Sequence, residues 1–385
     1  MLNDMRLYIA IVMYMVGGLS LMIFNFVVIY RTKVKDKNTG KLNTQWRRVI
    51  LLESPDGTEK SEFSEKHEKY LYKKLKNVEN LEVFSNALEY YRERRDISSV
   101  FDGYMNMAAK SSVFQRLAFD YRRARNEERA YFAYFISMFP QLAGDTYTNL
   151  LDILISYIEN ANIYCRTNVL KALCKIGNIQ ALVNALEVMN DNYIFMYQRF
   201  LTDELMAFAG DKEALSLFLW AKYKNWNAQL MVSIVIFITM VSGEFKEVFF
   251  PILQSEDTDP EIRLAVVRYY RKYKYEPVRP ILIEYVADSA NINLAIVSAH
   301  TLSSYPGEDT TAALNNALRS SNWHLRYNSA SNLVDLGLST GDMSTLSAID
   351  DKYAKEIVNY MMELKNVAPL TEVKSRREGE RVDAS

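Results

Sequence analysis

The chain has 385 residues and a net charge of −1, which argues against a protein held on nucleic acid mainly through its phosphates. Hydrophobic residues make up 49% of it and charged residues 24%, a balance typical of a folded chain rather than a disordered one. Two cysteines exclude a disulfide framework, three histidines leave little room for an imidazole metal site, and only 13 glycines and 8 prolines disfavour a turn-rich β fold.

The first predicted element is a membrane-spanning helix from Leu7 to Tyr30, a run of 24 residues without a charged side chain. At a rise of ~1.5 Å per residue the run covers roughly 36 Å, enough for a hydrocarbon core of ~30 Å. The alternatives are a buried helix of a soluble protein and a secretory signal peptide. A signal peptide has a shorter apolar region and a cleavage site of small residues, whereas this run ends in Val28, Ile29 and Tyr30.

The charges that flank this run predict its orientation. A membrane-proximal basic cluster follows it, whereas Arg6 on the other side is partly offset by Asp4. Lys and Arg stay on the cytoplasmic side of a membrane, so we expect a single-pass protein of the cell membrane with its N-terminus outside and the rest in the cytoplasm. The two cysteines, Cys165 and Cys174, fit such a reducing compartment. The basic cluster consists of Arg31, Lys33, Lys35 and Lys37.

Residues 31–62 are predicted to be a charged juxtamembrane linker. The sequence from Ser54 to Gly57, Ser-Pro-Asp-Gly, is a strong turn signal, and the four apolar residues before it could be a short strand or a helix end. The linker could therefore contain a hairpin. From residue 63 onwards the apolar spacing of three and four predicts helices. The last residues, 366–385, are polar and are expected to be disordered.

An internal repeat with a period near 33 residues runs through the body of the chain. Glycine followed by a polar residue recurs at Gly144, Gly177, Gly210 and Gly243, each 33 residues after the last. Further matches follow at Gly307, two shorter periods later, and at Gly337. Glycine suits a left-handed helix C-terminus, and the polar residue after it suits the start of the next helix.

Such a period predicts an all-α solenoid, because one helix pair cannot bury its apolar face alone and successive pairs must share a core. We expect this array to cover residues 63–365, with the clearest repeats over 130–350. A second apolar run, from Leu230 to Val241, has 12 residues, too few to span a membrane, and is predicted to be a buried helix of the array.

Residues 259–267, DPEIRLAVV, resemble the HEAT-repeat motif, in which Asp and Pro precede an Arg on the first helix of a pair. Residues 322–330, NWHLRYNSA, resemble it less fully, and Val232 and Ile296 occupy the Arg position in two other units. The resemblance covers about residues 100–350. It implies a right-handed α-solenoid of short HEAT-like helix pairs, which in general acts as an interaction scaffold. It also implies that the repeat arginines brace neighbouring repeats as ion-pair partners. These are Arg166, Arg199, Arg263 and Arg326.

Sequence motifs for catalysis are absent. The chain has no glycine-rich phosphate loop and no Gly-x-Ser-x-Gly elbow, and His67, His300 and His324 lie far apart without metal-ligand spacing. We therefore predict a non-enzyme without cofactor, metal or small-molecule substrate, although a solenoid can assemble a site from distant repeats.

One stretch is predicted to bind a protein partner, because basic residues and tyrosines alternate in it. Guanidinium groups and amphipathic tyrosines suit protein hot spots and acidic partners, whereas the plainer interpretation is a solvated helix end whose long side chains cover apolar surface. A second basic cluster would face acidic lipid headgroups. The first stretch comprises Arg268, Tyr269, Arg271, Lys272, Tyr273, Lys274 and Arg279. The second cluster comprises Arg116, Arg122, Arg123, Arg125 and Arg129, diluted by Asp120, Glu127 and Glu128.

The leading hypothesis is a non-catalytic, membrane-tethered scaffold or adaptor whose solenoid binds a protein partner at the cytoplasmic face. This architecture would suit an accessory subunit of a membrane enzyme complex such as a glycosyltransferase. The rivals are an enzyme, since short HEAT-like arrays resemble those of bilin lyases and of a group of DNA glycosylases, and a module that senses anionic lipid. The neutral net charge and the apolar N-terminal run argue against a nucleic-acid enzyme.

Overall fold

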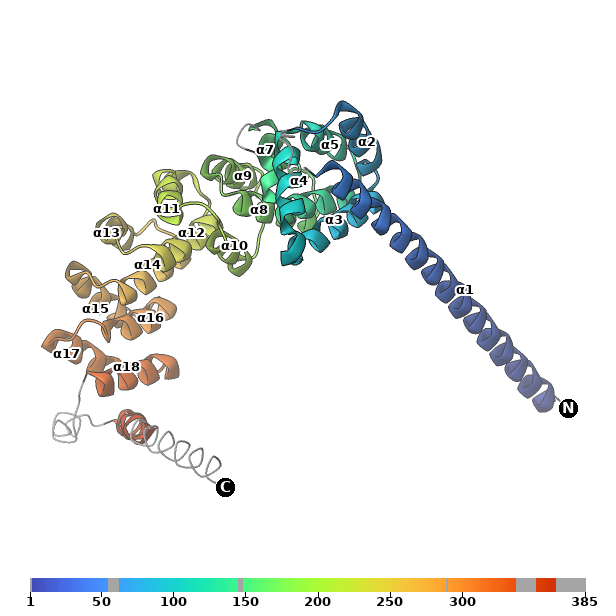
Figure 1. Cartoon of the computed structure of the whole chain (residues 1–385). Helices are drawn as coiled ribbons and strands as arrows, with labels where there is room; N and C mark the ends of the chain where they lie inside the picture. Colours follow the sequence, from blue (N-terminus) through green and yellow to red (C-terminus); the bar gives the residue numbers. More distant parts are fainter. Residues whose placement is uncertain (1, 55–61, 145–147, 289, 337–350, 365–385) are drawn as a thin grey trace, which may run out of the picture. The chain divides into compact units, whose positions relative to one another are not determined.

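The computed structural model describes residues 2–54, 62–144, 148–288, 290–336 and 351–364, and all regular structure in them is helical (Figure 1). The all-α prediction is therefore confirmed for the described residues. The chain divides into two compact units, which are described separately. Unit 1 comprises Met1–Asn192 and Phe208–Gly210, and unit 2 comprises Tyr193–Ala207 and Asp211–Ser385. The predicted tail, 366–385, lies outside the described residues.

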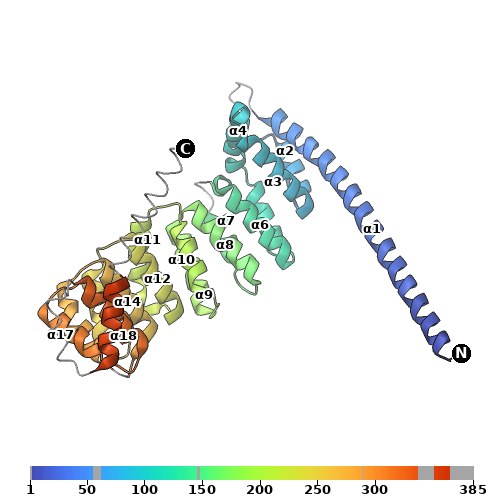
Figure 2. The same cartoon turned by 90° about the horizontal axis from the view of Figure 1, so that it is seen from below.

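Unit 1 is built from two layers of helices. In one layer α1, α3, α6 and α8 pack one after another (Figure 2). In the other layer α2, α5, α7 and α9 do so, while α4 packs against α3 and α1. The helices are α1 (Leu2–Glu53), α2 (Glu65–Leu75), α3 (Val78–Glu93), α4 (Ser98–Lys110), α5 (Val113–Tyr121), α6 (Asn126–Met138), α7 (Thr148–Ile155), α8 (Ile163–Ile176) and α9 (Ile179–Asp191), with short 3₁₀ turns at Arg95–Ile97 and Pro140–Ala143.

Unit 2 has a helical-repeat pattern of the same kind. One layer is the series α10, α12, α14, α16 and α18, in which each helix packs on the next, and α11, α13, α15 and α17 cover these helices from the other side. The helices are α10 (Gln198–Met206), α11 (Lys212–Ala221), α12 (Ala228–Val241), α13 (Lys246–Gln254), α14 (Pro260–Lys272), α15 (Arg279–Ala287), α16 (Ile292–Leu302), α17 (Glu308–Ala317) and α18 (Trp323–Asp335), with 3₁₀ turns at Tyr223–Asn225 and Glu276–Val278 and a further helix at 352–364.

The predicted period appears in the hydrogen bonds between neighbouring helices. Lys272 Nζ donates to the carbonyl of Thr239 at 2.9 Å, and Ser304 Oγ donates to the carbonyl of Arg271 at 3.1 Å, each across 33 residues. Corresponding positions of successive helix pairs are thus in contact, as expected where each pair stacks on the one before.

The glycines of the repeat have two different roles. Gly177 has φ 77° and caps the C-terminus of α8, and Asn178 caps the start of α9, as predicted. Gly210 and Gly243 do not have left-handed backbones and are needed for close packing instead. A Cβ at Gly210 would lie 2.6 Å from the carbonyl oxygen of Gly177, and a Cβ at Gly243 would lie 2.7 Å from the ring of Tyr273.

The other glycine positions of the repeat differ from the prediction or lie outside the described residues. Gly144 has φ 52° but ends a short 3₁₀ turn rather than an α-helix. Gly307 precedes α17 as its N-cap rather than following a helix. Gly337 lies outside the described residues. The spacing of 33 therefore reflects the period of the packing more than one shared turn conformation.

The predicted linker differs most from the structure, because residues 31–53 continue α1 as one helix of 52 residues. Its last turns carry Trp46 and Ile50, four residues apart on one face, and both side chains are fully buried against the array. The charges of residues 31–41 suggested a linker, but they lie on the exposed part of the helix. α1 ends at Glu53, and the predicted turn residues after Ser54 lie outside the described residues.

Candidate membrane anchor and partner surface

The N-terminal part of α1 is long and apolar enough to cross a membrane. The candidate span is Met13–Glu53, and none of its most apolar window is buried inside the structure. The large side chains from Met13 to Tyr30 are exposed, including Tyr14 at 84% and Phe24 at 64%. Among the described residues of unit 1 no helix covers this stretch, so it is not a core helix of that part of the array.

The C-terminal part of α1 is a core helix of unit 1. The Trp46 ring lies 4.9 Å from that of Phe84 on α3, and the hydroxyl of Tyr91 donates to the carbonyl of Arg47 at 2.9 Å. The Arg47 guanidinium stacks on Tyr90, 3.6 Å from the ring centre. The exposed apolar stretch and the packed end therefore belong to one uninterrupted helix.

Between these two parts, α1 carries the predicted membrane-proximal cations. Arg31, Lys33 and Lys37 have exposed side chains, and Lys35 lies on the same helix. A groove of about 490 Å³ runs between this stretch of α1 and the start of α3. Its walls include Tyr30, Arg31 and Val34 on α1, and Glu79 and Glu82 on α3.

The structure divides the predicted partner-binding stretch between core and surface. Tyr269 is fully buried, its hydroxyl accepts a hydrogen bond from the backbone N–H of Phe245 at 3.0 Å, and burial raises its pKa to about 12. Tyr269 therefore braces α14 against the start of α13 and is not available to a partner. Tyr273 is half-buried and packs 4.9 Å from Tyr269, ring centre to ring centre.

Two of the cations in this stretch have structural partners. Lys272 donates to the carbonyl of Thr239 in the last turn of α12. Arg279 Nε lies 3.3 Å from Asp309 Oδ2 on α17, and its guanidinium also lies 3.7 Å from Glu276. Both side chains therefore connect elements of the array.

Three exposed cations remain, Arg268, Arg271 and Lys274, and they take part in no ion pair among the described residues. We call these three residues the α14 basic surface. Beside them on α16, the pKa of His300 is lowered by burial and by the charge of Arg271. Burial and Arg271 thus disfavour the charged form of His300, and the three exposed cations present the positive charge of the α14 basic surface to solvent.

Among the described residues, the repeat arginines form no ion pair with a neighbouring repeat of the kind that the resemblance implies. Arg263 donates to the carbonyls of Thr258 and Glu256 in the loop before its own helix, at 3.1 and 3.3 Å. Arg166 is half-buried on α8. Arg199 lies beside Asp203 on its own helix, α10, and Arg326 lies near the ring of Tyr353.

Buried tyrosines tie neighbouring helices together, a role that motif reasoning missed. Tyr121 donates to the carbonyl of Leu75 at 2.8 Å, and Tyr305 donates to the carbonyl of Tyr270 at 2.8 Å while it accepts from the N–H of Tyr275. Such bonds satisfy helix carbonyls and fix the register of one helix against the next. The only sequence signal was the count of 26 tyrosines.

The described residues offer little for catalysis. They contain no group of three or more His, Cys, Asp or Glu side chains placed to hold a metal ion. Cys165 and Cys174 are buried on α8, and burial raises the pKa of the Cys165 thiol, which disfavours the reactive thiolate. His67 is buried with its Nε2 3.0 Å from the hydroxyl of Tyr104. The absence of an enzymatic activity stays a prediction.

Comparison with known proteins adds no family. No protein-family model matches the chain, and no curated protein matches it in sequence. The HEAT-like resemblance therefore depends on the motif at residues 259–267 together with the helical-repeat architecture.

Proposed function

We propose that this protein is a non-catalytic adaptor tethered to a membrane by α1. In this proposal residues 7–30 cross the cell membrane once, the N-terminus lies outside, and the HEAT-like array binds a protein partner at the cytoplasmic face. The observation that carries the proposal is the continuity of α1, which has an exposed apolar stretch at one end and the buried Trp46 at the other.

The exposure of the apolar stretch favours a bilayer as its surroundings. An unpartnered apolar surface of this length is costly in water, and it matches the thickness of a hydrocarbon core. The tether would hold the array close to other membrane proteins and raise its effective concentration there without any new contact. An accessory subunit of a membrane enzyme complex, such as a glycosyltransferase, would use such an arrangement.

The α14 basic surface supports the choice of an acidic protein partner. Arg268, Arg271 and Lys274 are exposed, and their charges are not neutralised by ion pairs among the described residues. Arginine is over-represented at interface hot spots because its planar donors match carboxylates.

Extraction from membranes tests the tether. The full chain should stay in membranes washed with alkaline carbonate and should be released by detergent. Protease added to intact cells should leave residues 31–385 uncleaved. Release by carbonate, or cleavage of the array from outside, would overturn the proposed anchor or its orientation.

Crosslinking in membranes tests the partner surface. The doubly changed Arg268→Glu/Arg271→Glu chain should lose a crosslinked partner that the unchanged chain captures. A matched control is Arg199→Glu/Lys224→Glu, which reverses two exposed charges elsewhere on unit 2. Equal capture by both variants would eliminate the α14 basic surface and leave the tether standing.

A further inference from the structure

Resting on the proposed tether, we infer that one edge of unit 1 is a second membrane contact that binds anionic lipid headgroups. We call this edge the basic rim. It combines the end of α2 with the loop between α5 and α6. Its cations are Lys73, Lys74, Lys76, Arg122, Arg123 and Arg125.

The end of α2 points back along α1 toward the apolar stretch. Early in α2, His67 Nδ1 lies 3.8 Å from Glu53 Oε1 at the end of α1. One turn later, the ring of Tyr70 lies 5.6 Å from that of Trp46, farther back on α1. The two helices are therefore antiparallel, and Lys73 and Lys74 lie on the side from which the proposed span arrives.

The loop after α5 lies on the same edge, because α5 runs parallel to α2. Three contacts in chain order establish this alignment. Ser111, two residues before α5, donates to Glu68 at 2.6 Å, Tyr72 donates to Asp120 at 2.8 Å, and Tyr121 donates to the carbonyl of Leu75 at 2.8 Å. Arg122 and Arg123 follow directly and lie beside the end of α2.

The register of α3 against α1 sets the distance from the rim to the membrane. Trp46 packs on Phe84, and Glu79 at the start of α3 lines the same groove as Val34 farther back on α1, so the two helices run parallel. α3 begins after its N-cap Asn77, seven residues before Phe84. Asn77 is thus level with about Thr39, nine residues beyond Tyr30, or ~13 Å along α1. The headgroup layer takes up about 5–8 Å of that distance. The remainder is within the reach of long basic side chains and is no greater than the Debye screening length of ~8 Å at physiological salt, so their charges still interact with the headgroups.

The rim carries more positive charge than its neighbourhood neutralises. Residues 73–77 and 121–125 contain six cations and no acid. Two nearby carboxylates are already occupied, Asp120 by Lys76 at 2.9 Å and Glu128 by Arg125 at 2.8 Å. Burial alone would raise the pKa of Asp120, but hydrogen bonds from Lys76 and Tyr72 outweigh it and leave that pKa lowered.

Four cations are then left for lipid phosphates. Lys73, Lys74, Arg122 and Arg123 are exposed and take part in no ion pair among the described residues, while the acids Glu79 and Glu127 lie in the first turns of α3 and α6.

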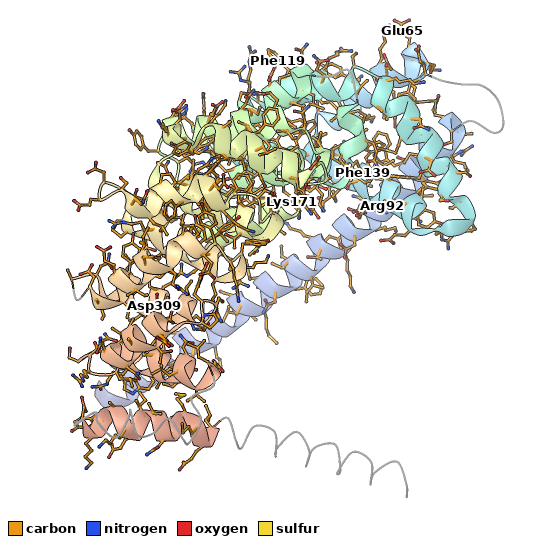
Figure 3. The ribbon with its side chains drawn as sticks, turned by 90° about the vertical axis from the view of Figure 1, so that its left-hand side faces the viewer. Glu65, Arg92, Phe119, Phe139, Lys171 and Asp309 are labelled. Carbon is orange, nitrogen blue, oxygen red and sulfur yellow. The ribbon has the colours of Figure 1, made fainter. Side chains whose placement is uncertain are left out.

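Aromatic side chains complete the fit to a membrane interface. Phe119, in the last turn of α5, is 46% exposed on the outer side of unit 1 (Figure 3), and the Arg123 guanidinium lies 5.3 Å from its ring centre. Tyr164, at the start of α8, is 73% exposed. Tyrosine is enriched at membrane interfaces, and phenylalanine occurs on the apolar faces of interfacial helices, so the Phe119 ring beside Arg123 adds an apolar contact to the charges of the rim.

Lysine footprinting on the full chain in vesicles tests the rim. One vesicle type contains phosphatidylcholine alone, and the other contains phosphatidylcholine mixed with phosphatidylglycerol. A membrane-impermeant acylating reagent modifies exposed lysines, and mass spectrometry gives the rate at each site. Anionic vesicles should slow acylation of Lys73 and Lys74 about fivefold, the factor that corresponds to one basic residue held at an anionic surface. Lys110 and Lys175 lie in the last turns of α4 and α8, outside the basic rim. They serve as internal controls, and their acylation rates should not change.

Charge reversal separates docking from mere proximity. In Arg122→Glu/Arg123→Glu the protection of Lys73 and Lys74 should disappear, whereas the control Lys171→Glu/Lys175→Glu should keep it. Raised salt should also remove it. Equal rates in both vesicle types, or protection that survives Arg122→Glu/Arg123→Glu, would overturn the rim. Carbonate extraction of the same vesicles reports on α1 separately, so loss of the tether is distinguishable from loss of docking.

Discussion

Two apolar helical stretches of this chain, drawn from the same residue types, have opposite surroundings. The first part of α1 exposes nearly every side chain from Met13 to Tyr30, whereas α12 buries most of its side chains between α10, α11 and α14. α12 has 14 residues, too few to span a bilayer. The comparison shows that apolar content identifies a helix whose side chains must be removed from water. The length of the helix and the helices packed around it decide whether protein or lipid surrounds it.

The largest effect is expected from charges placed in the exposed stretch of α1. The double change Leu19→Arg/Ile23→Arg puts two cations near the centre of the proposed span, at a cost of about 3 kcal/mol for each in a bilayer. The chain should become extractable by carbonate, while the thermal unfolding of the array stays unchanged because no array residue touches these positions. Leu19→Val/Ile23→Val is the matched control. Retention of the double-Arg chain in carbonate-washed membranes would argue against a spanning role.

The same kind of change in α12 should have the opposite result. Ile234→Asp places an unpaired carboxylate in a fully buried position and should cost more than about 4 kcal/mol of folding free energy. Unit 2 should unfold at much lower temperature in calorimetry of the detergent-solubilised chain, whereas membrane retention through α1 should persist. Met240→Asp, on the same helix but half exposed, should shift the transition only slightly.

Trp46→Ala tests where the exposed and buried parts of α1 meet. Removing this buried side chain from its contacts with Phe84 and Tyr70 should cost about 3–5 kcal/mol of unit 1 stability. Carbonate extraction should still leave the chain in the membrane, since the apolar stretch is intact. Arg48→Ala, on the exposed side of the same turn, is the control. An unchanged unfolding temperature would mean that α1 does not belong to the core of unit 1.

The smallest expected effect concerns the C-terminal end of α12. Lys272→Met removes the ammonium group that caps the carbonyl of Thr239 and should cost about 0.3–1 kcal/mol, the usual value for a cation at a helix C-terminus. Calorimetry should show a small decrease in the unfolding temperature of unit 2. Lys274→Met, which removes a cation without such a contact, should show none. If Lys272→Met instead abolished partner capture at unchanged stability, Lys272 would belong to the α14 basic surface after all.

The sequence predicted the elements better than their junctions. The charge-free run to Tyr30 and the 12-residue run to Val241 were distinguished by length alone, and the 33-residue spacing of glycines anticipated contacts such as Lys272 with Thr239. The helix through residues 31–53 was missed because its charges face outwards, and only Trp46 and Ile50 mark the buried face. Two apolar residues in a charged stretch do not reveal that another helix will cover them.

The candidate surfaces were harder to predict for a related reason. Tyr269 stands between Arg268 and the cations that follow, so composition made it look like part of one basic and aromatic patch. In the folded chain adjacent helical residues face different directions, and Tyr269 is buried while Arg268 is exposed. Likewise, six cations at residues 73–76 and 122–125 gather on one edge only because α2 and α5 run parallel, which no local pattern encodes.

Because α1 is one continuous helix, the number of residues between the proposed span and Trp46 determines how unit 1 is rotated about the helix axis. Between Tyr30 and Trp46, each residue added to α1 would turn unit 1 by about 100° around the helix axis and lift it by about 1.5 Å. One extra residue would rotate the lysines and arginines of the rim to a different side of the α1 axis. Seven extra residues would nearly restore their original direction, but about 10 Å farther from the proposed span. The number of residues in this stretch thus determines both the rotation of unit 1 about α1 and its distance from the proposed span, whichever side chains the stretch contains.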